Sequence, residues 1–151
     1  MTTEKKTKKA SIRRIERDLR HDPPAPPIAW WRTIRADHFN AATAKLLRNA
    51  IANVAILGEP AWREAAEGDA AAAIGLALRL HPHTSPMIYD LVMTALAACA
   101  AEDSGAAGMA MSRVVYQCPG AGRAEARVAT SWLVRSFGKI APSQKKAGGF
   151  R

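Results

Sequence analysis

Residues 85–101 have the sequence SPMIYDLVMTALAACAA, which carries a regular helical pattern. Ser85 and Pro86 are typical of a helix start, because serine can cap the free amides of the first turn and proline fits the first helical position. Apolar residues then recur on one face, at Ile88, Leu91, Val92, Ala95 and Leu96. The stretch therefore predicts an amphipathic helix that runs to about Ala101.

Similar signals predict helices on the C-terminal side of this stretch. Ser104 is positioned to cap a helix that reaches Tyr116, and Pro119-Gly120 then closes it. A last helix is expected from about Gly122 to Ile140. Its predicted core anchors are Val128, Trp132, Phe137 and Ile140.

Helices are also predicted on the N-terminal side. Asp69 is expected to cap a helix through Leu80, and Pro60 to open a short segment around Trp62. A longer helix is expected over about 37–57. Its predicted apolar face consists of Phe39, Ala42, Leu46, Ala50, Val54 and Leu57. No segment alternates apolar and polar residues between turn signals, so strands are not expected.

These elements predict an all-α fold, a compact bundle or a short stack of helical hairpins with about five to six helices. Short segments such as Ala65-Ala66-Glu67 and Ala100-Ala101-Glu102 recur at an interval typical of two-helix repeats, which favours stacked hairpins. Residues 1–27 are expected to be a disordered basic arm with a short amphipathic helix and a proline-rich linker. Residues 28–141 form the predicted helical domain, and residues 142–151 a basic flexible tail.

The sequence contains no recognisable catalytic pattern, so we expect a protein that is not an enzyme and that holds no cofactor or metal. His81 and His83 form a close pair but lack a third ligand, and no histidine follows Cys118. Cys99 and Cys118 are expected to be reduced thiols on different helices, as is typical of a cytoplasmic protein. No run of 18 apolar residues occurs, so membrane insertion is not expected.

Charge is distributed unevenly along the chain, whose formal net charge is +9. Residues 1–22 have eight basic and four acidic groups, and residues 113–151 have eight basic groups and one acidic group. Residues 59–112 have two basic and seven acidic groups. Basic ends around an acidic middle favour a polyanionic partner.

The basic residues of the two ends are the predicted nucleic-acid-binding groups. In the arm they are Lys5, Lys6, Lys8, Lys9, Arg13, Arg14, Arg17 and Arg20. On the last helix Arg123, Arg127 and Arg135 are expected to share one ridge, followed by Lys139. The amides of Gly120-Ala121-Gly122 at the start of that helix are a candidate for one phosphate contact. Such contacts to the phosphate backbone, of DNA or of RNA, carry no sequence information.

Trp30 and Trp31 are adjacent, so at least one is expected to face away from the core and to form a partner interface. The leading hypothesis is a non-enzymatic helical accessory protein that binds nucleic acid as a subunit of a larger assembly. The alternative is a protein–protein interaction or scaffold module of helical hairpins with no nucleic-acid role. Self-association into a homo-oligomer stays open, because the alanine-rich chain has few large anchors.

Overall fold

The computed structural model describes residues 25–140. The predicted arm helix, its eight basic residues and the basic tail after residue 141 lie outside the described residues. The separation of the chain into arm, domain and tail therefore stays a prediction.

The described chain consists of helices joined by loops and has no strand, which confirms the all-α prediction. It has seven α-helices and two short 3-10 helices, η1 and η2. In chain order they are η1 (Pro27–Ala29), α2 (Trp30–Thr33), η2 (Ala36–His38), α3 (Ala41–Ile51), α4 (Trp62–Glu67), α5 (Ala70–Leu78), α6 (Pro86–Ala101), α7 (Gly105–Gln117) and α8 (Arg123–Ile140). The number of α-helices exceeds the predicted five to six, because the segment before Asn40 breaks into short pieces.

Asp69 and Ser104 cap their helices as predicted, while Ser85 occupies the N-cap position of α6 but its side chain forms no capping hydrogen bond. The Asp69 side chain accepts a hydrogen bond from the Ala72 amide at 2.8 Å, and Ser104 accepts one from Ala107 at 3.2 Å. Each bond satisfies an amide that a helix start leaves without an intrahelical partner. Pro86 is the first residue of α6. Local chemistry therefore determines these helix starts.

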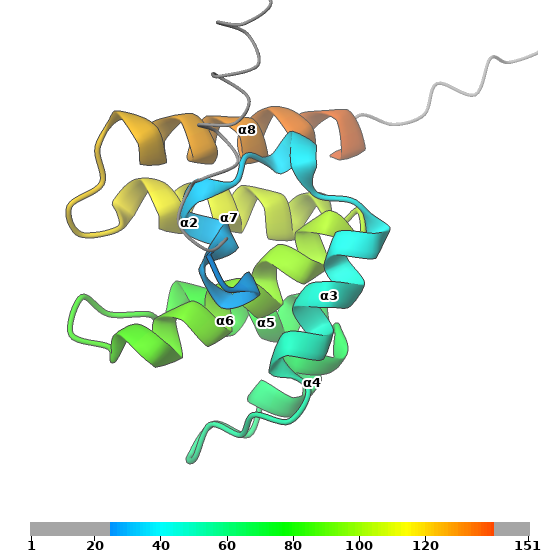
Figure 1. The fold of residues 1–151 in the computed structure, drawn as a ribbon, viewed down its shortest axis with the longest axis vertical. Helices are drawn as coiled ribbons and strands as arrows, with labels where there is room; N and C mark the ends of the chain where they lie inside the picture. The colour runs from blue at the N-terminus through cyan, green and yellow to red at the C-terminus, as the bar shows by residue number, and fades with distance from the viewer. Residues whose placement is uncertain (1–24, 141–151) are drawn as a thin grey trace, which may run out of the picture.

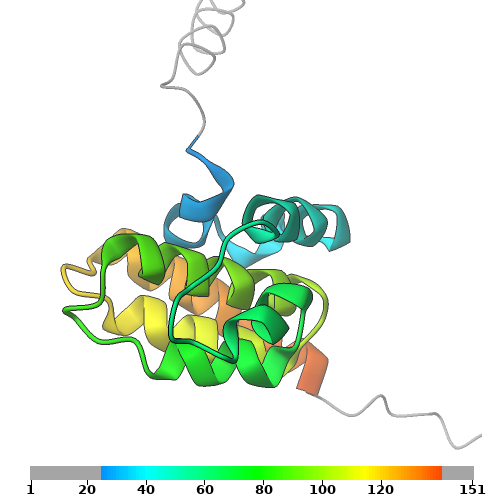
Figure 2. The ribbon, with the colours of Figure 1, turned by 90° about the horizontal axis from the view of Figure 1, so that it is seen from below.

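Helix α6 is the centre of the fold. All residues from Leu91 to Ala101 are buried, and α6 packs against η1, α2, α3, α4, α5 and α7. In Figure 2, α6 lies between α3 on one side and α5 with α7 on the other. The predicted single apolar stripe is therefore too narrow, because neighbours cover this helix on every side over its last eleven residues.

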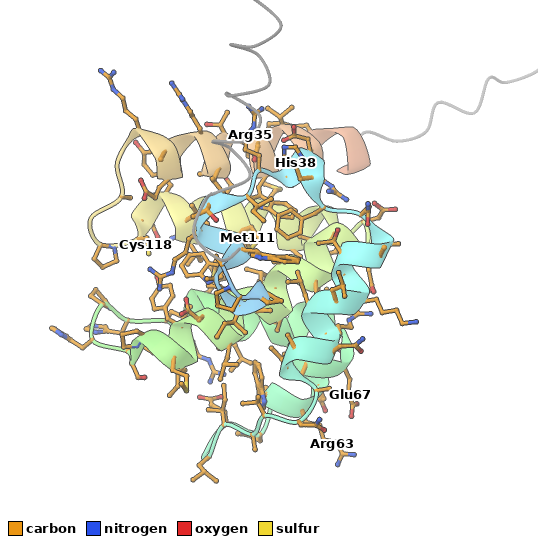
Figure 3. All side chains as sticks on the ribbon, viewed as in Figure 1. Arg35, His38, Arg63, Glu67, Met111 and Cys118 are labelled. Atoms are coloured by element: carbon orange, nitrogen blue, oxygen red, sulfur yellow. The ribbon has the colours of Figure 1, made fainter. Side chains whose placement is uncertain are left out.

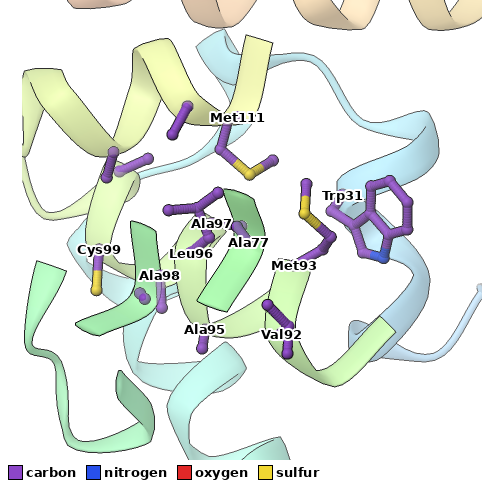
Figure 4. Close-up of a cluster of buried hydrophobic side chains, with 14 of the residues drawn as sticks. Trp31, Ala77, Val92, Met93, Ala95, Leu96, Ala97, Ala98, Cys99 and Met111 are labelled. Carbon is purple, nitrogen blue, oxygen red and sulfur yellow. The ribbon is translucent and has the colours of Figure 1, made fainter. Parts of the chain in front are cut away.

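Helices α5, α6, α7 and α8 pack against their neighbours in chain order, and α7 also packs against α5 (Figures 1 and 2). The short helix α2 contacts both α6 and α8. Its Trp31 lies in the core close to Met93, and Met111 of α7 lies in the same cluster (Figure 4). Within residues 25–140, no helix has the length and apolar composition needed to cross a bilayer.

The predicted face of the helix over 37–57 is wrong. Asn40 caps α3, which ends at Ile51, and the buried residues are Ala44, Leu47 and Ile51. Leu57 is 95% exposed in the loop after α3. Phe39 reaches the core from extended backbone before the helix, so its position does not predict the buried face of α3.

The predicted anchors of the last helix are correct in part. Val128 and Trp132 are buried, but Phe137 is exposed, and the Ile140 side chain lies outside the described part. Ser136 takes the inward position instead, opposite Gly108 of α7. A Cβ atom at Gly108 would lie 2.2 Å from the Ser136 hydroxyl oxygen. The close approach of the two helices explains why small residues, and not Phe137, are used here.

Candidate nucleic-acid interface

Arg123 and Arg127 lie on the N-terminal half of α8 and are both exposed. Because they are four residues apart in an uninterrupted α-helix, they share a face with a separation of about 6 Å along its axis. In residues 25–140 neither forms a hydrogen bond or an ion pair. Both guanidinium groups can therefore bind an external anion without losing an internal partner.

A groove of about 900 Å³ lies beside Arg127, between α8 and residues 35–39. Arg35, Arg127 and Arg135 line it together with Asp37, which gives these four groups a net charge of +2. Thr130 and Ser131 add hydroxyl groups to its wall. Figure 3 shows Arg35 and His38 beside α8, far from Arg63 and Glu67 at the other end of the molecule.

Arg35 is less available than Arg127, because its Nε lies 3.3 Å from an Asp37 carboxylate oxygen. The other Asp37 oxygen lies 4.0 Å from His38 Nε2. All three side chains are well exposed, so water screens these pairs. A phosphate entering the groove would meet Arg127 directly and Arg35 only in competition with Asp37.

Arg135 is turned inward, which corrects its prediction as a phosphate ligand on the same ridge. Its Nη1 donates hydrogen bonds to the carbonyls of Ala36 and Phe39, both at 2.6 Å. Its Nη2 donates to the Ala101 carbonyl at 3.1 Å and lies 3.9 Å from Asp103. The side chain is only 21% exposed. Loop and helix-end carbonyls need donors, and Arg135 supplies them.

At the start of α8, the Glu125 carboxylate binds a backbone amide predicted to bind phosphate. The Gly122 amide, predicted as a phosphate donor, donates a hydrogen bond to Glu125 Oε2 at 2.8 Å. This bond, with one from the Glu125 backbone, holds the pKa of Glu125 below its ordinary value. The predicted phosphate contact at this turn is therefore replaced by an internal cap.

Trp31 is 1% exposed, so it belongs to the core and not to a partner surface, which corrects its prediction. Its indole N–H donates a hydrogen bond to Asp90 at 3.0 Å, and its ring stacks on Tyr89 with a centroid distance of 5.7 Å. Arg32 also donates to Asp90 and lies 4.5 Å from the Trp31 ring centroid. This cluster attaches α2 to α6.

Trp30 is half-buried, and its indole N–H donates to the Ala25 carbonyl at 2.7 Å. It alone of the adjacent tryptophans has surface that a partner could touch. Lys139 lies in the last turn of α8, and its side chain lies outside the described part.

Sequence reasoning missed Arg35 and Asp37 as lining residues of the groove. Their contact with α8 joins segments that are far apart in the chain, and the Ala36 amide donates to the Ser131 hydroxyl at 2.9 Å across that junction. The net charge of residues 23–58 is +3, which is a signal for a basic surface but not for its location.

His81 and His83 have ring centroids 5.1 Å apart. No group of three or more metal-ligating residues occurs in the part of the chain that the structure covers. Comparisons of this chain with models of protein families, with curated proteins and with solved structures find no match.

Proposed function

We propose that this chain is a non-enzymatic accessory protein that binds nucleic acid through contacts to the phosphate backbone. The observation that carries the proposal is that Arg123 and Arg127 are exposed and have no internal partners in the described chain. Arg127 also lines a groove together with Arg35 and Arg135. Guanidinium groups bind phosphate through two parallel hydrogen bonds, which makes arginine a favoured phosphate ligand.

The contrast with the other arginines supports this assignment. Six of them in the described chain bind carboxylates or carbonyls: Arg32, Arg35, Arg48, Arg63, Arg79 and Arg135. Binding a phosphate there would break an existing contact. At Arg123 and Arg127 no such contact is lost, so the full attraction of the phosphate contributes to binding. Arg113 also has no such partner within residues 25–140, but it lines a different hollow and has no second unpaired arginine one turn away on its helix.

The charge pattern of the whole chain agrees with the proposal. The eight basic arm residues and Lys139 would add phosphate contacts to those of α8. Because phosphate contacts are independent of the bases, this surface would not select a sequence. A protein of this kind fits as a subunit of a larger nucleic-acid assembly.

The proposal is tested by measuring the affinity of the full chain for a labelled oligonucleotide at low salt by fluorescence anisotropy. Arg123→Gln combined with Arg127→Gln is expected to weaken binding about tenfold. The matched control combines Lys45→Gln with Arg113→Gln, which removes the same charge from exposed residues elsewhere. An equal loss in both variants, or no binding by the natural chain, would refute the proposed site.

A protein-interaction module is the second candidate, and exposed apolar residues around the end of α3 favour it. Leu46, Val54 and Leu57 all expose their side chains there. In Figure 1 the loop after α3 lies at the opposite end of the molecule from α8. This candidate predicts that the purified chain co-elutes with one defined protein after nuclease treatment, and that Leu57→Ser abolishes the association.

A further inference from the structure

The exposed face of α8 includes five residues in a line along the helix, of which Arg123 and Arg127 are the first two. Thr130, Val134 and Phe137 follow at intervals of three or four residues, and all are exposed. This spacing keeps the five side chains on one line along the helix. We call this line the α8 stripe.

The chemistry of the α8 stripe changes from one end to the other. Its N-terminal part has two free guanidinium groups, and its C-terminal part exposes Val134 at 66% and Phe137 at 60%. A helix that only covered a core would turn Phe137 inward. A helix that only met phosphates would gain nothing from an exposed phenyl ring.

Charge and ring together match the two parts of a nucleotide. Proteins that bind a single strand usually combine two features. Basic residues in a groove neutralise the phosphates, and an aromatic ring beside them stacks on a base. In a duplex the faces of the bases are stacked on each other, so an aromatic side chain on a convex helix surface cannot reach them. Arginine contacts to phosphate do not by themselves distinguish the two forms.

We propose that the α8 stripe binds single-stranded nucleic acid, with Arg123 and Arg127 on phosphates and Phe137 stacked on a base. This inference rests on the proposed function and names its substrate class. Fourteen residues separate Arg123 from Phe137, a rise of about 21 Å. At about 3.4 Å per stacked nucleotide, the stripe spans about six nucleotides.

The test compares a labelled single-stranded twelve-nucleotide oligomer (about twice the proposed site length) with the duplex of the same sequence, using the full chain at one low salt concentration. Phe137→Leu keeps an apolar side chain but removes the aromatic face. It is expected to lower single-strand affinity about tenfold and to leave duplex affinity unchanged. Phe137→Trp is expected to restore single-strand affinity. Leu78→Ala, a substitution of an exposed apolar residue of α5, is the control.

A second readout reports stacking itself. A 2-aminopurine base in the oligomer changes its fluorescence when it stacks, and this change is expected with the natural chain and with Phe137→Trp but not with Phe137→Leu. Because Phe137 is exposed, its variants should keep the helical circular dichroism spectrum of the natural chain.

The outcomes separate the inference from the proposed function. Equal single-strand affinity of the natural chain and Phe137→Leu overturns the inference, while the loss in the Arg123 and Arg127 variant would still support phosphate binding. No binding of either form overturns both. Loss of a defined, nuclease-resistant protein partner in Phe137→Leu, without loss of oligonucleotide, would assign the stripe to protein docking and also overturn the inference.

Discussion

Individual residues fix the junctions between helices in this fold. Gly68 ends α4 with a φ of +111°, a left-handed conformation that favours glycine, and its amide donates to the Ala65 carbonyl. Arg48 of α3 lies against Gly68 and forms an ion pair with Glu102 after α6. Because Gly68 has no side chain, Arg48 of α3 can lie against the end of α4 and also reach Glu102 after α6.

Gly68→Ala is expected to destabilise the protein by about 1–3 kcal/mol. The new Cβ atom would lie 2.6 Å from Arg48 Nη2, and alanine is strained at this φ. Gly75→Ala is the matched control, because Gly75 lies within α5 with no atom within 4 Å of its Cβ position. It should stabilise the helix by about 0.5–1 kcal/mol. Urea unfolding measures both, and a stable Gly68→Ala protein would contradict the account.

Tyr89 is expected to make stability depend on alkaline pH. Burial, with the Cys118 side chain beside the phenol, raises the pKa of Tyr89 from 10.0 to about 12. The folded state holds the phenol proton more tightly than the unfolded state. The contribution of Tyr89 to the free energy of unfolding is therefore complete below pH 10 and is lost as pH rises toward 12. Phenolate absorbance should show the late titration, and Tyr89→Phe should remove it. A chain without this late component would refute the partial burial of the Tyr89 phenol beside Trp31 and Cys118.

At the scale of elements, the sequence predicts helix starts better than helix faces. Caps such as Asp69 and Ser104 act within a few residues, so their chemistry is visible locally. The buried face of α3 and the inward turn of Arg135 depend on segments far along the chain. The run after Asp90, which is apolar except for Thr94, is a signal for the all-round burial of α6, because only a covered helix tolerates apolar residues on every side.

Arg135 is expected to hold η2, α6 and α8 together. Arg135→Met should destabilise the protein by about 2–4 kcal/mol, because the carbonyls of Phe39 and Ala101 lose the Arg135 donor and the Ala36 carbonyl keeps only the Phe39 amide. Arg127→Met changes an exposed arginine on the same helix and should alter stability by less than about 0.5 kcal/mol. Thermal unfolding compares the two variants. Similar midpoints would show that Arg135 is not a structural contact.

At the scale of the whole molecule, basic groups without internal partners are separated from an acidic middle that is largely paired. Five of the seven carboxylates of residues 59–112, from Glu59, Glu67, Asp90, Glu102 and Asp103, form ion pairs within the fold. The total charge and its location at the ends can be predicted from sequence. The sequence does not predict that Arg123 and Arg127 are free while Arg135 is bound internally. The spacing of arginines along a helix does not reveal which of them lies next to backbone carbonyls of another segment.

The basic arm is expected to add affinity without selectivity. Replacing its eight basic residues with glutamine should weaken binding of single strands and duplexes by a similar factor, because phosphate is common to both. Parallel titrations with the two forms measure this factor. A loss confined to one form would assign the arm a different role.

The dependence of affinity on salt tests the central claim most directly, because it counts the phosphates that the protein neutralises. For a single strand, each phosphate contact adds about 0.7 to the slope of log K against log salt concentration. The combined Arg123→Gln and Arg127→Gln variant should therefore lower the magnitude of that slope by about 1.4. The Lys45→Gln and Arg113→Gln control should leave it unchanged. An unchanged slope in the α8 variant would show that these arginines do not contact phosphate.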